Sequence, residues 1–132
     1  MEKYTSEFLC FIIDEQCYAL PLESIEVVIR AQTITELENK SPFLHGIIDL
    51  HGVIVPIISL RKRFSIQEAK IRLTDRFIII NTGKRSLGII VDEVTNIITV
   101  APEEILESSE IFNGLRYMKV FKLVNFGKKV WK

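Results

Sequence analysis

The sequence predicts an all-β protein, a barrel or a sandwich, from three observations. Runs rich in Val, Ile and Phe recur along the chain, each short and each bounded by polar or turn residues. Two hairpin turns are explicit, at 13–16 and 81–84, and the second contains Gly83, which tolerates positive φ. Helical periodicity is scarce. Pro56 cannot donate to a ladder and marks a strand edge or a bulge. The expected strands are 8–13, 17–20, 47–50, 53–60, 77–80, 87–91, 97–100 and 120–126.

The strand pattern occurs twice along the chain. Residues 8–29 can be laid over residues 77–98 without a gap, an offset of 69 positions, although few residues are identical. The match resumes between 55–60 and 121–126 after a contraction of three residues. Because period-two strands align with one another easily, chance similarity is the alternative. We interpret the match as an internal duplication, which predicts two similar lobes with a groove between them.

Short helical turns are expected between some of the strands. Residues 22–27 and 91–96 follow the second strand of each half. Glu23 and Asp92 lie near the starts of these turns, where a carboxylate satisfies unpaired backbone N–H groups. Capping is therefore the expected role of both acidic side chains. Residues 59–64 are expected to form a short capped helix after a long strand.

Length and charge predict one balanced domain. The chain has 132 residues, about the length of a single domain, and the polar segment 65–74 is the predicted linker between its halves. Seventeen basic and seventeen acidic residues cancel, so no global field attracts nucleic acid or an anionic membrane. Neither a membrane span nor a signal peptide fits the apolar runs, which predicts a cytoplasmic protein.

No pattern in the sequence predicts an enzyme, a cofactor or a metal site. His45, His51, Cys10 and Cys17 are potential zinc ligands, but neither pair has the C-x2-C or H-x3-5-H spacing. The two cysteines could face each other across a hairpin, and a cytosolic pair is expected to be reduced. The Gly-Lys pair at 83–84 lacks the other glycines of a phosphate loop. No serine lies in a G-x-S-x-G elbow.

Basic clusters keep one alternative open. Five-stranded barrels with basic grooves commonly bind single-stranded nucleic acid, and the basic candidates here lie at 61–63, 72, 76, 84–85, 128–129 and 132. Base stacking needs aromatic rings on an exposed strand face, whereas most aromatic residues here alternate like core residues. A solvated basic face is the preferred interpretation, and a single-stranded nucleic-acid-binding barrel is the second functional hypothesis.

One long motif names a family. Residues 43–64 read FLHGIIDLHGVIVPIISLRKRF, and further short motifs lie around this segment at 18–22, 25–30, 34–37 and 88–94. The segment closely resembles the signature of the CheW-type chemotaxis coupling proteins, F-I-x-G-V-x-N-L-R-G-x-I-x-P-V-x-D-L-R-x-R-F. The resemblance covers about residues 7–127. The signature positions that keep their spacing are Gly46, Gly52, Pro56, Leu60, Arg61, Arg63 and Phe64.

The resemblance implies a fold and a role. The fold would be a single CheW-like domain over residues 1–132, made of two side-by-side five-stranded SH3-like β-barrels. Lobe one would lie mainly at about 15–70 and lobe two mainly at about 75–126, and terminal strands could cross from one lobe to the other. The role would be that of a non-enzymatic adaptor without cofactors, joining the cytoplasmic tip of chemoreceptors to the regulatory domain of the histidine kinase CheA. Such a protein is cytoplasmic, recruited to membrane receptor arrays, monomeric when isolated, and binds neither nucleic acid nor the bilayer directly.

Residue-by-residue transfer gives a receptor-binding site of Ile25, Val27, Gly46 and His51. An aliphatic side chain can fill a hole in a partner helix, and a glycine lets another backbone approach closely. On this basis Gly46→Trp should abolish receptor binding and leave the thermal transition nearly intact. An ordinary core role for Ile25 and a turn role for Gly46 are the alternatives. No kinase-contact residue is predicted.

Several positions depart from the family pattern. His51 replaces the Arg of N-L-R-G, which makes a fixed charge titratable. Val27 replaces the Glu of V-x-E-V, and Ser59 replaces the Asp of D-L-R, although serine can still cap a helix. The sequence diverges most after 113–114, so kinase contacts in that region are left open.

Overall fold

The computed structural model describes residues 6–38, 42–100, 107–112 and 115–122, with side chains described between Glu7 and Thr99. Ten strands are present in these ranges, with one 3-10 turn, η1 (Leu22–Ser24), and one short helix, α1 (Leu60–Arg63). The strands are β1 (Ser6–Ile13), β2 (Gln16–Pro21), β3 (Ile25–Arg30), β4 (Leu44–Leu50), β5 (Val53–Ile58), β6 (Arg76–Asn81), β7 (Ser86–Val91), β8 (Glu93–Val100), β9 (Glu107–Phe112) and β10 (Leu115–Lys122).

The strands form two five-stranded sheets, which confirms the all-β prediction. One sheet, here called sheet A, has the order β8-β1-β2-β10-β9, and the other, sheet B, has the order β3-β6-β7-β5-β4. Exchanging β1–β5 with β6–β10 converts one order into the other, as a duplicated unit requires. One junction differs, because β5 runs parallel to β7 whereas β10 runs antiparallel to β2. Closure of either sheet into a barrel stays a prediction.

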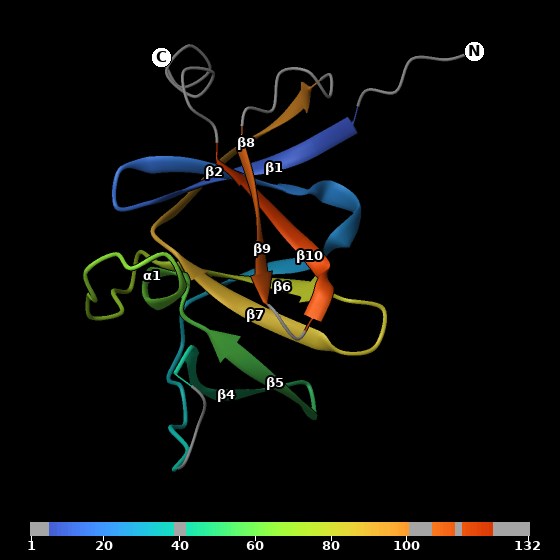
Figure 1. The fold of residues 1–132 in the computed structure, drawn as a ribbon. Helices are drawn as coiled ribbons and strands as arrows, with labels where there is room; N and C mark the ends of the chain where they lie inside the picture. The colour runs from blue at the N-terminus through green and yellow to red at the C-terminus, as the bar shows by residue number, and fades with distance from the viewer. Residues whose placement is uncertain (1–5, 39–41, 101–106, 113–114, 123–132) are drawn as a thin grey trace.

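Each half of the chain gives its first hairpin to the other sheet. The β1–β2 hairpin joins β8, β9 and β10, while the β6–β7 hairpin joins β3, β4 and β5. Figure 1 shows β1 and β2 in the upper part of the molecule and β4 and β5 at the bottom. Both sheets therefore contain residues from both halves. Terminal strands were expected to cross from one lobe to the other, and in the structure whole hairpins do so. The sequence boundaries expected for the lobes remain a prediction.

The core follows the period-two alternation of the strands. On β6, Ile78 and Ile80 enter a central core between the sheets, whereas Phe77 and Ile79 enter a second core beside sheet B. All four side chains are completely buried, and burial of each contributes roughly 1.5–3 kcal/mol. The central core draws on both sheets. Its buried members are Leu9, Phe11, Ile13, Tyr18, Leu20, Ile58, Leu60, Ile78, Ile80, Leu87, Ile89 and Val91.

The turns between strands use the left-handed region. Asp14 and Glu15 have φ of 52° and 67° in the predicted β1–β2 turn, and Gly83 has φ of 95° in the predicted β6–β7 turn. At the β4–β5 turn His51 and Gly52 have φ of 54° and 87°, values typical of a type I′ hairpin. Both hairpins expected from the sequence are confirmed.

One local prediction is wrong, and a second is right only locally. Residues 91–96 are not a helical turn, because β8 starts at Glu93 and pairs with β1, with Val94 opposite Phe11. Pairing with β1 outweighs the local preference for a turn. Pro56 lies on an inner strand, because β5 lies between β7 and β4, but at the proline the side of β5 toward β7 is unpaired, so the edge prediction holds only locally. The proline is tolerated in β5 because β7 pairs only with Ile57 and Ile58. No hydrogen bond to β7 therefore requires an N–H group from Pro56.

The segment after α1 is anchored at both ends. Ser59 caps α1 as predicted, and its side chain accepts a hydrogen bond from the Lys62 N–H at 3.3 Å. Further along the predicted linker, Ile66 packs against the central core and Ile71 against the core beside sheet B. The linker is therefore packed against both cores of the molecule.

Candidate protein-interaction surfaces

The two predicted residues on β3 face different ways. A register shift lies between Ile25, which pairs with Ile80, and Val27, which pairs with Ile79. Because directly opposed residues share a face, Ile25 faces the central core and Val27 the core beside sheet B. Ile25 is half-buried and packs against the central core. Val27 is exposed. Both the contact role and the core role of Ile25 thus agree with its position.

The same register shift places Val28 beside Ile25. Val28 pairs with Ile78, another central-core residue, and is 36% exposed. A bulge of this kind puts residues three apart on one face, where a regular strand would put residues two apart. Val28 was missed because regular alternation assigns the face of Ile25 to Val27.

Strand β8 repeats this arrangement at the duplicated positions. Val94 corresponds to Ile25 at the 69-residue offset, packs against the central core and pairs with Phe11. A register shift in the pairing with β1 then places Ile97 opposite Leu9, also a central-core residue. Ile97 is 52% exposed. The four residues Ile25, Val28, Val94 and Ile97 are here called the aliphatic positions, two from each half of the duplication.

Gly46 is covered by the chain itself. An added Cβ would overlap the Cγ2 of Ile34 and the backbone oxygen of Thr35, whose segment bridges to β4 at Ile47. The glycine does permit a close backbone approach, but the approaching backbone is that of Thr35. The geometry contradicts the expectation that Gly46→Trp leaves stability intact, because a backbone oxygen cannot move aside as a flexible side chain can.

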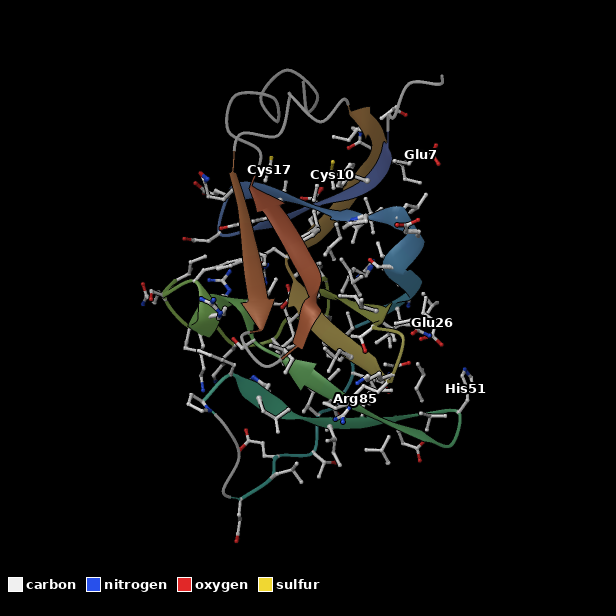
Figure 2. All side chains as sticks on the ribbon, turned by 45° about the vertical axis from the view of Figure 1, so that its right-hand side comes forward. Glu7, Cys10, Cys17, Glu26, His51 and Arg85 are labelled. Atoms are coloured by element: carbon white, nitrogen blue, oxygen red, sulfur yellow. The ribbon has the colours of Figure 1, made fainter. Side chains whose placement is uncertain are left out.

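His51 lies at the tip of the β4–β5 hairpin. Its side chain is exposed and projects away from the body of the protein in Figure 2. Asp49 Oδ1 supports the turn by accepting the Gly52 N–H at 2.7 Å. Val53 and Ile54, which follow, are both exposed aliphatic residues. The structure does not gather Ile25, Val27, Gly46 and His51 into one of its described hollows.

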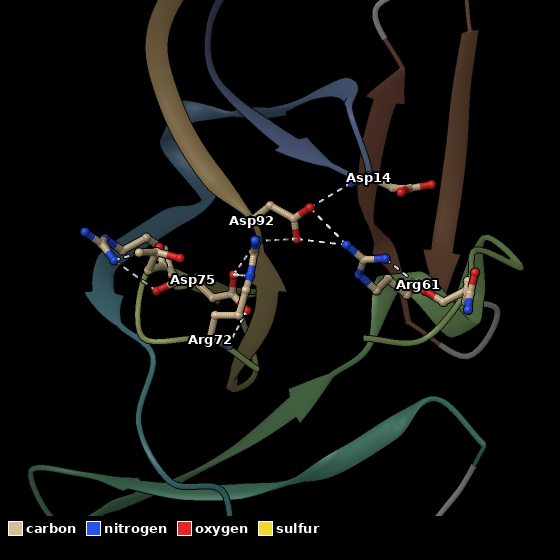
Figure 3. Close-up of polar contacts among 8 residues, drawn as sticks. Asp14, Arg61, Arg72, Asp75 and Asp92 are labelled. Atoms are coloured by element: carbon tan, nitrogen blue, oxygen red, sulfur yellow. Dashed lines mark hydrogen bonds and ion pairs between the residues drawn. The ribbon is translucent and has the colours of Figure 1, made fainter. Parts of the chain in front are cut away.

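A network centred on Asp92 joins the sheets where β7 of sheet B passes into β8 of sheet A (Figure 3). Asp92 Oδ2 accepts the Asp14 N–H at 2.8 Å and the Arg61 Nη2 at 2.9 Å, and the Asp92 N–H donates to the Ile12 oxygen. The Arg61 and Asp92 side chains are 17% and 20% exposed. Glu23 and Asp92, which lie 69 positions apart, were both expected to cap helical turns. Glu23 is instead exposed and makes no described hydrogen bond.

The end of the signature segment holds the sheets together. Besides the Arg61–Asp92 pair, the Phe64 ring stacks on Tyr18 of β2 with 5.2 Å between centroids, and the Arg63 guanidinium lies 5.8 Å from the Phe43 centroid. These contacts link the residues after β5 to sheet A and to the residues before β4. The retained motif therefore has a structural function here.

A hollow beside sheet B lies next to this network. Its volume is about 310 Å³, and His45 of β4 forms part of its wall. Arg72 also lines the hollow and is held by Asp75, with Nε and Nη2 lying 3.1 and 3.0 Å from Oδ1. The full lining is Ala31, Gln32, Thr33, Ile34, His45, Ile71, Arg72 and Leu73.

The residue types that bear on metal binding, thiol chemistry and base stacking can be placed within the described residues. Within them, no three His, Cys, Asp or Glu side chains are placed to hold a metal ion. Cys10 and Cys17 are not joined in a disulfide, and burial, with Cys17 nearby, raises the pKa of the Cys10 thiol to about 12. The rings of Phe11 and Phe77 are completely buried. No helix in the described ranges is long and apolar enough to cross a membrane.

Comparison with known proteins places the chain in a family. The profile of the CheW-like domain matches residues 7–118. The chain belongs to the CheW-like domain family. Its curated relatives include "Chemotaxis protein CheW" of Klebsiella aerogenes, 31% identical over 109 residues, covering 83% of this chain and 66% of the relative. The protein of the same name from Bacillus subtilis is 32% identical over 108 residues, covering 82% and 69%.

A solved structure is similar to this CheW-like domain throughout most of its length. The crystal structure of the scaffolding protein TtCheW from Thermoanaerobacter tengcongensis superimposes with a TM-score of 0.71 at 30% identity. The match covers 77% of this chain and 70% of that protein. The chain thus spans about two thirds of the length of these relatives. The family predicted from residues 43–64 is confirmed.

Proposed function

We propose that this CheW-like domain is a non-enzymatic adaptor that couples chemoreceptors to the histidine kinase CheA. Two lines of support come from similarity: the curated relatives are named as chemotaxis proteins, and the structural relative is titled a scaffolding protein. As an adaptor the protein needs recognition surfaces and no catalytic group. In this proposal it acts as one domain, recruited from the cytoplasm to receptor arrays.

The observation that carries the proposal is the pair of exposed aliphatic side chains on the central-core side of the sheets. Val28 and Ile97 are exposed, and each shares a strand face with a half-buried residue, Ile25 or Val94. Exposed aliphatic residues backed by a rigid core suit a partner helix that presents apolar side chains at i, i+3 and i+4. The proposal assigns the receptor helix to these aliphatic positions and keeps Val27 and His51 as contacts expected from resemblance.

The decisive experiment measures binding of the protein to a receptor cytoplasmic fragment and to a CheA fragment containing the regulatory domain. Wild type is expected to bind both with modest affinity, since exchangeable adaptors use small interfaces. Val28→Asp and Ile97→Asp should each weaken receptor binding at least tenfold, because a charge would have to be desolvated in the contact. Both residues are exposed, so the thermal transitions should change little.

Leu37→Asp serves as the control, because it places the same charge on an exposed leucine away from the aliphatic positions. It should bind the receptor fragment like wild type. The adaptor proposal fails if wild type binds neither fragment at micromolar concentrations. The assignment to the aliphatic positions fails separately if wild type binds and both Asp variants retain full affinity. A salt titration against single-stranded DNA tests the nucleic-acid alternative, which requires an affinity that falls steeply with salt.

A further inference from the structure

Leu73 is the most exposed large aliphatic residue among those described, with 90% of its surface accessible. It lies on the wall of the hollow of about 310 Å³, with Ala31, Ile34 and Ile71 as further apolar lining. Polar groups of Gln32 and Thr33 line the same hollow. A volume near the lower end of the range for ligand sites suits one or two side chains of a protein segment.

Arg72 presents a held guanidinium at this hollow. Its Nε and Nη2 donate to Asp75 Oδ1, its backbone N–H donates to Asp75 Oδ2 at 2.8 Å, and Nη2 lies 3.8 Å from Asp92 Oδ1. Asp75 is 3% exposed and lies behind the arginine, whereas the Arg72 side chain is 59% exposed. Its Nη1 has no hydrogen bond to the described residues. A guanidinium fixed along one edge loses little conformational entropy when the other edge binds a carboxylate.

We propose that the hollow at Arg72 and Leu73 is a second protein-docking site, which takes a partner segment carrying an aliphatic side chain beside a carboxylate. The aliphatic group packs on Leu73, Ile34 and Ile71, and the carboxylate binds the outer edge of Arg72. Charge decides the occupant. Among the residues that line this hollow, Arg72 is the only Asp, Glu, Lys or Arg, and its partner Asp75 is covered, so an acidic segment is favoured over a basic one.

The site is separate from the aliphatic positions. Ala31 and Ile71 pack against the core beside sheet B, whereas Ile25 and Val94 pack against the central core. The hollow also begins beyond the end of β3 at Arg30, while Ile25 opens that strand. An adaptor with two such surfaces can hold two partners at once. The assignment of the segment to a chemosensory partner rests on the proposed function.

The test uses the full chain with the same receptor and CheA fragments, measured by titration calorimetry. Leu73→Ser removes the exposed apolar side chain at no cost to packing, and Thr33→Trp places a large side chain at another lining residue of the hollow. Leu73→Ser should weaken binding of one of the two fragments by about tenfold, the effect of losing the burial of one aliphatic side chain. Thr33→Trp should weaken binding of the same fragment because the indole ring occupies the space that the partner side chain needs. Arg72→Lys keeps a charge for Asp75 but loses the fork, so it should weaken the same fragment several-fold.

Leu37→Ser is the matched control, because it makes the same substitution at another exposed leucine that does not line the hollow. It should bind both fragments like wild type. The docking site is refuted if wild type binds and Leu73→Ser and Thr33→Trp both keep each affinity within about twofold. Failure of wild type to bind either fragment would instead overturn the proposed function, and this partner assignment with it.

Discussion

Asp92→Ala should cost the protein about 2–4 kcal/mol of unfolding free energy. The carboxylate accepts the Asp14 N–H at 2.8 Å and the Arg61 Nη2 at 2.9 and 3.1 Å, from residues on both sides of the junction between the sheets. Hydrogen bonds that involve a charged group contribute about 1.5–3 kcal/mol each, and side chains at 17% and 20% exposure retain some screening by water. Asp14 and Arg61 are therefore counted as two partners at about 1.5 kcal/mol each, which gives a loss of about 3 kcal/mol, the middle of the expected range.

The assay is urea unfolding followed by circular dichroism, with the free energy extrapolated to water. Glu23→Ala is a control supplied by the duplication, because Glu23 occupies the equivalent position, is exposed and makes no described contact. Its unfolding free energy should stay within about 0.5 kcal/mol of wild type. Asp92→Asn should fall between the two, since an amide oxygen can still accept one bond. Equal stability of the Asp92→Ala and Glu23→Ala proteins would refute the role given to the network.

Three further outcomes are expected. Gly46→Ala should lower the unfolding free energy by about 1–3 kcal/mol, because its Cβ would overlap the Thr35 oxygen; an unchanged urea midpoint would contradict this. A thiol reagent at pH 8 should label half-buried Cys17 and spare Cys10, whose pKa is raised to about 12 by burial; equal labelling of the two native thiols would be the opposing result. Because burial raises the Cys10 pKa only in the folded protein, the protonated thiol contributes fully to the unfolding free energy below the pKa of the unfolded chain. This contribution is lost as the pH rises toward 12, and Cys10→Ala should reduce the loss in alkaline urea titrations.

Much of the fold was predictable because its determinants are local. The alternation of β6 places Phe77 and Ile79 on one face and Ile78 and Ile80 on the other, and both faces are apolar. A short run of Phe and Ile bounded by turn residues is typical of a strand that is buried on both faces. The turn at Gly83 was likewise predictable from residue type. Residues 91–96 were not, because the partner that makes them a strand, β1, is more than eighty positions away in the sequence.

The candidate surfaces were predictable only in part. Residue type showed that Gly46 permits a close approach, but only the fold shows that Thr35 makes it. Val28 could not be found from the sequence, because a bulge reverses the faces that regular alternation would assign. The equivalence of Ile25 with Val94 was available from the duplication, and it led to the second pair of residues once the registers were known.

The sequence alone determined the family, the strand character of the chain and its twofold repetition, since all three depend on residue type and spacing. The tertiary structure decided which strands share a sheet. Either assignment of the two hairpins would satisfy the same alternation, so only packing distinguishes them. The tertiary structure also gave different surroundings to Glu23 and Asp92, which occupy equivalent positions in the duplication. Asp92 pairs with Arg61 because α1 follows β5 at the junction between the sheets, whereas Glu23 remains exposed to solvent. Both are acidic side chains, so residue type alone does not predict this difference.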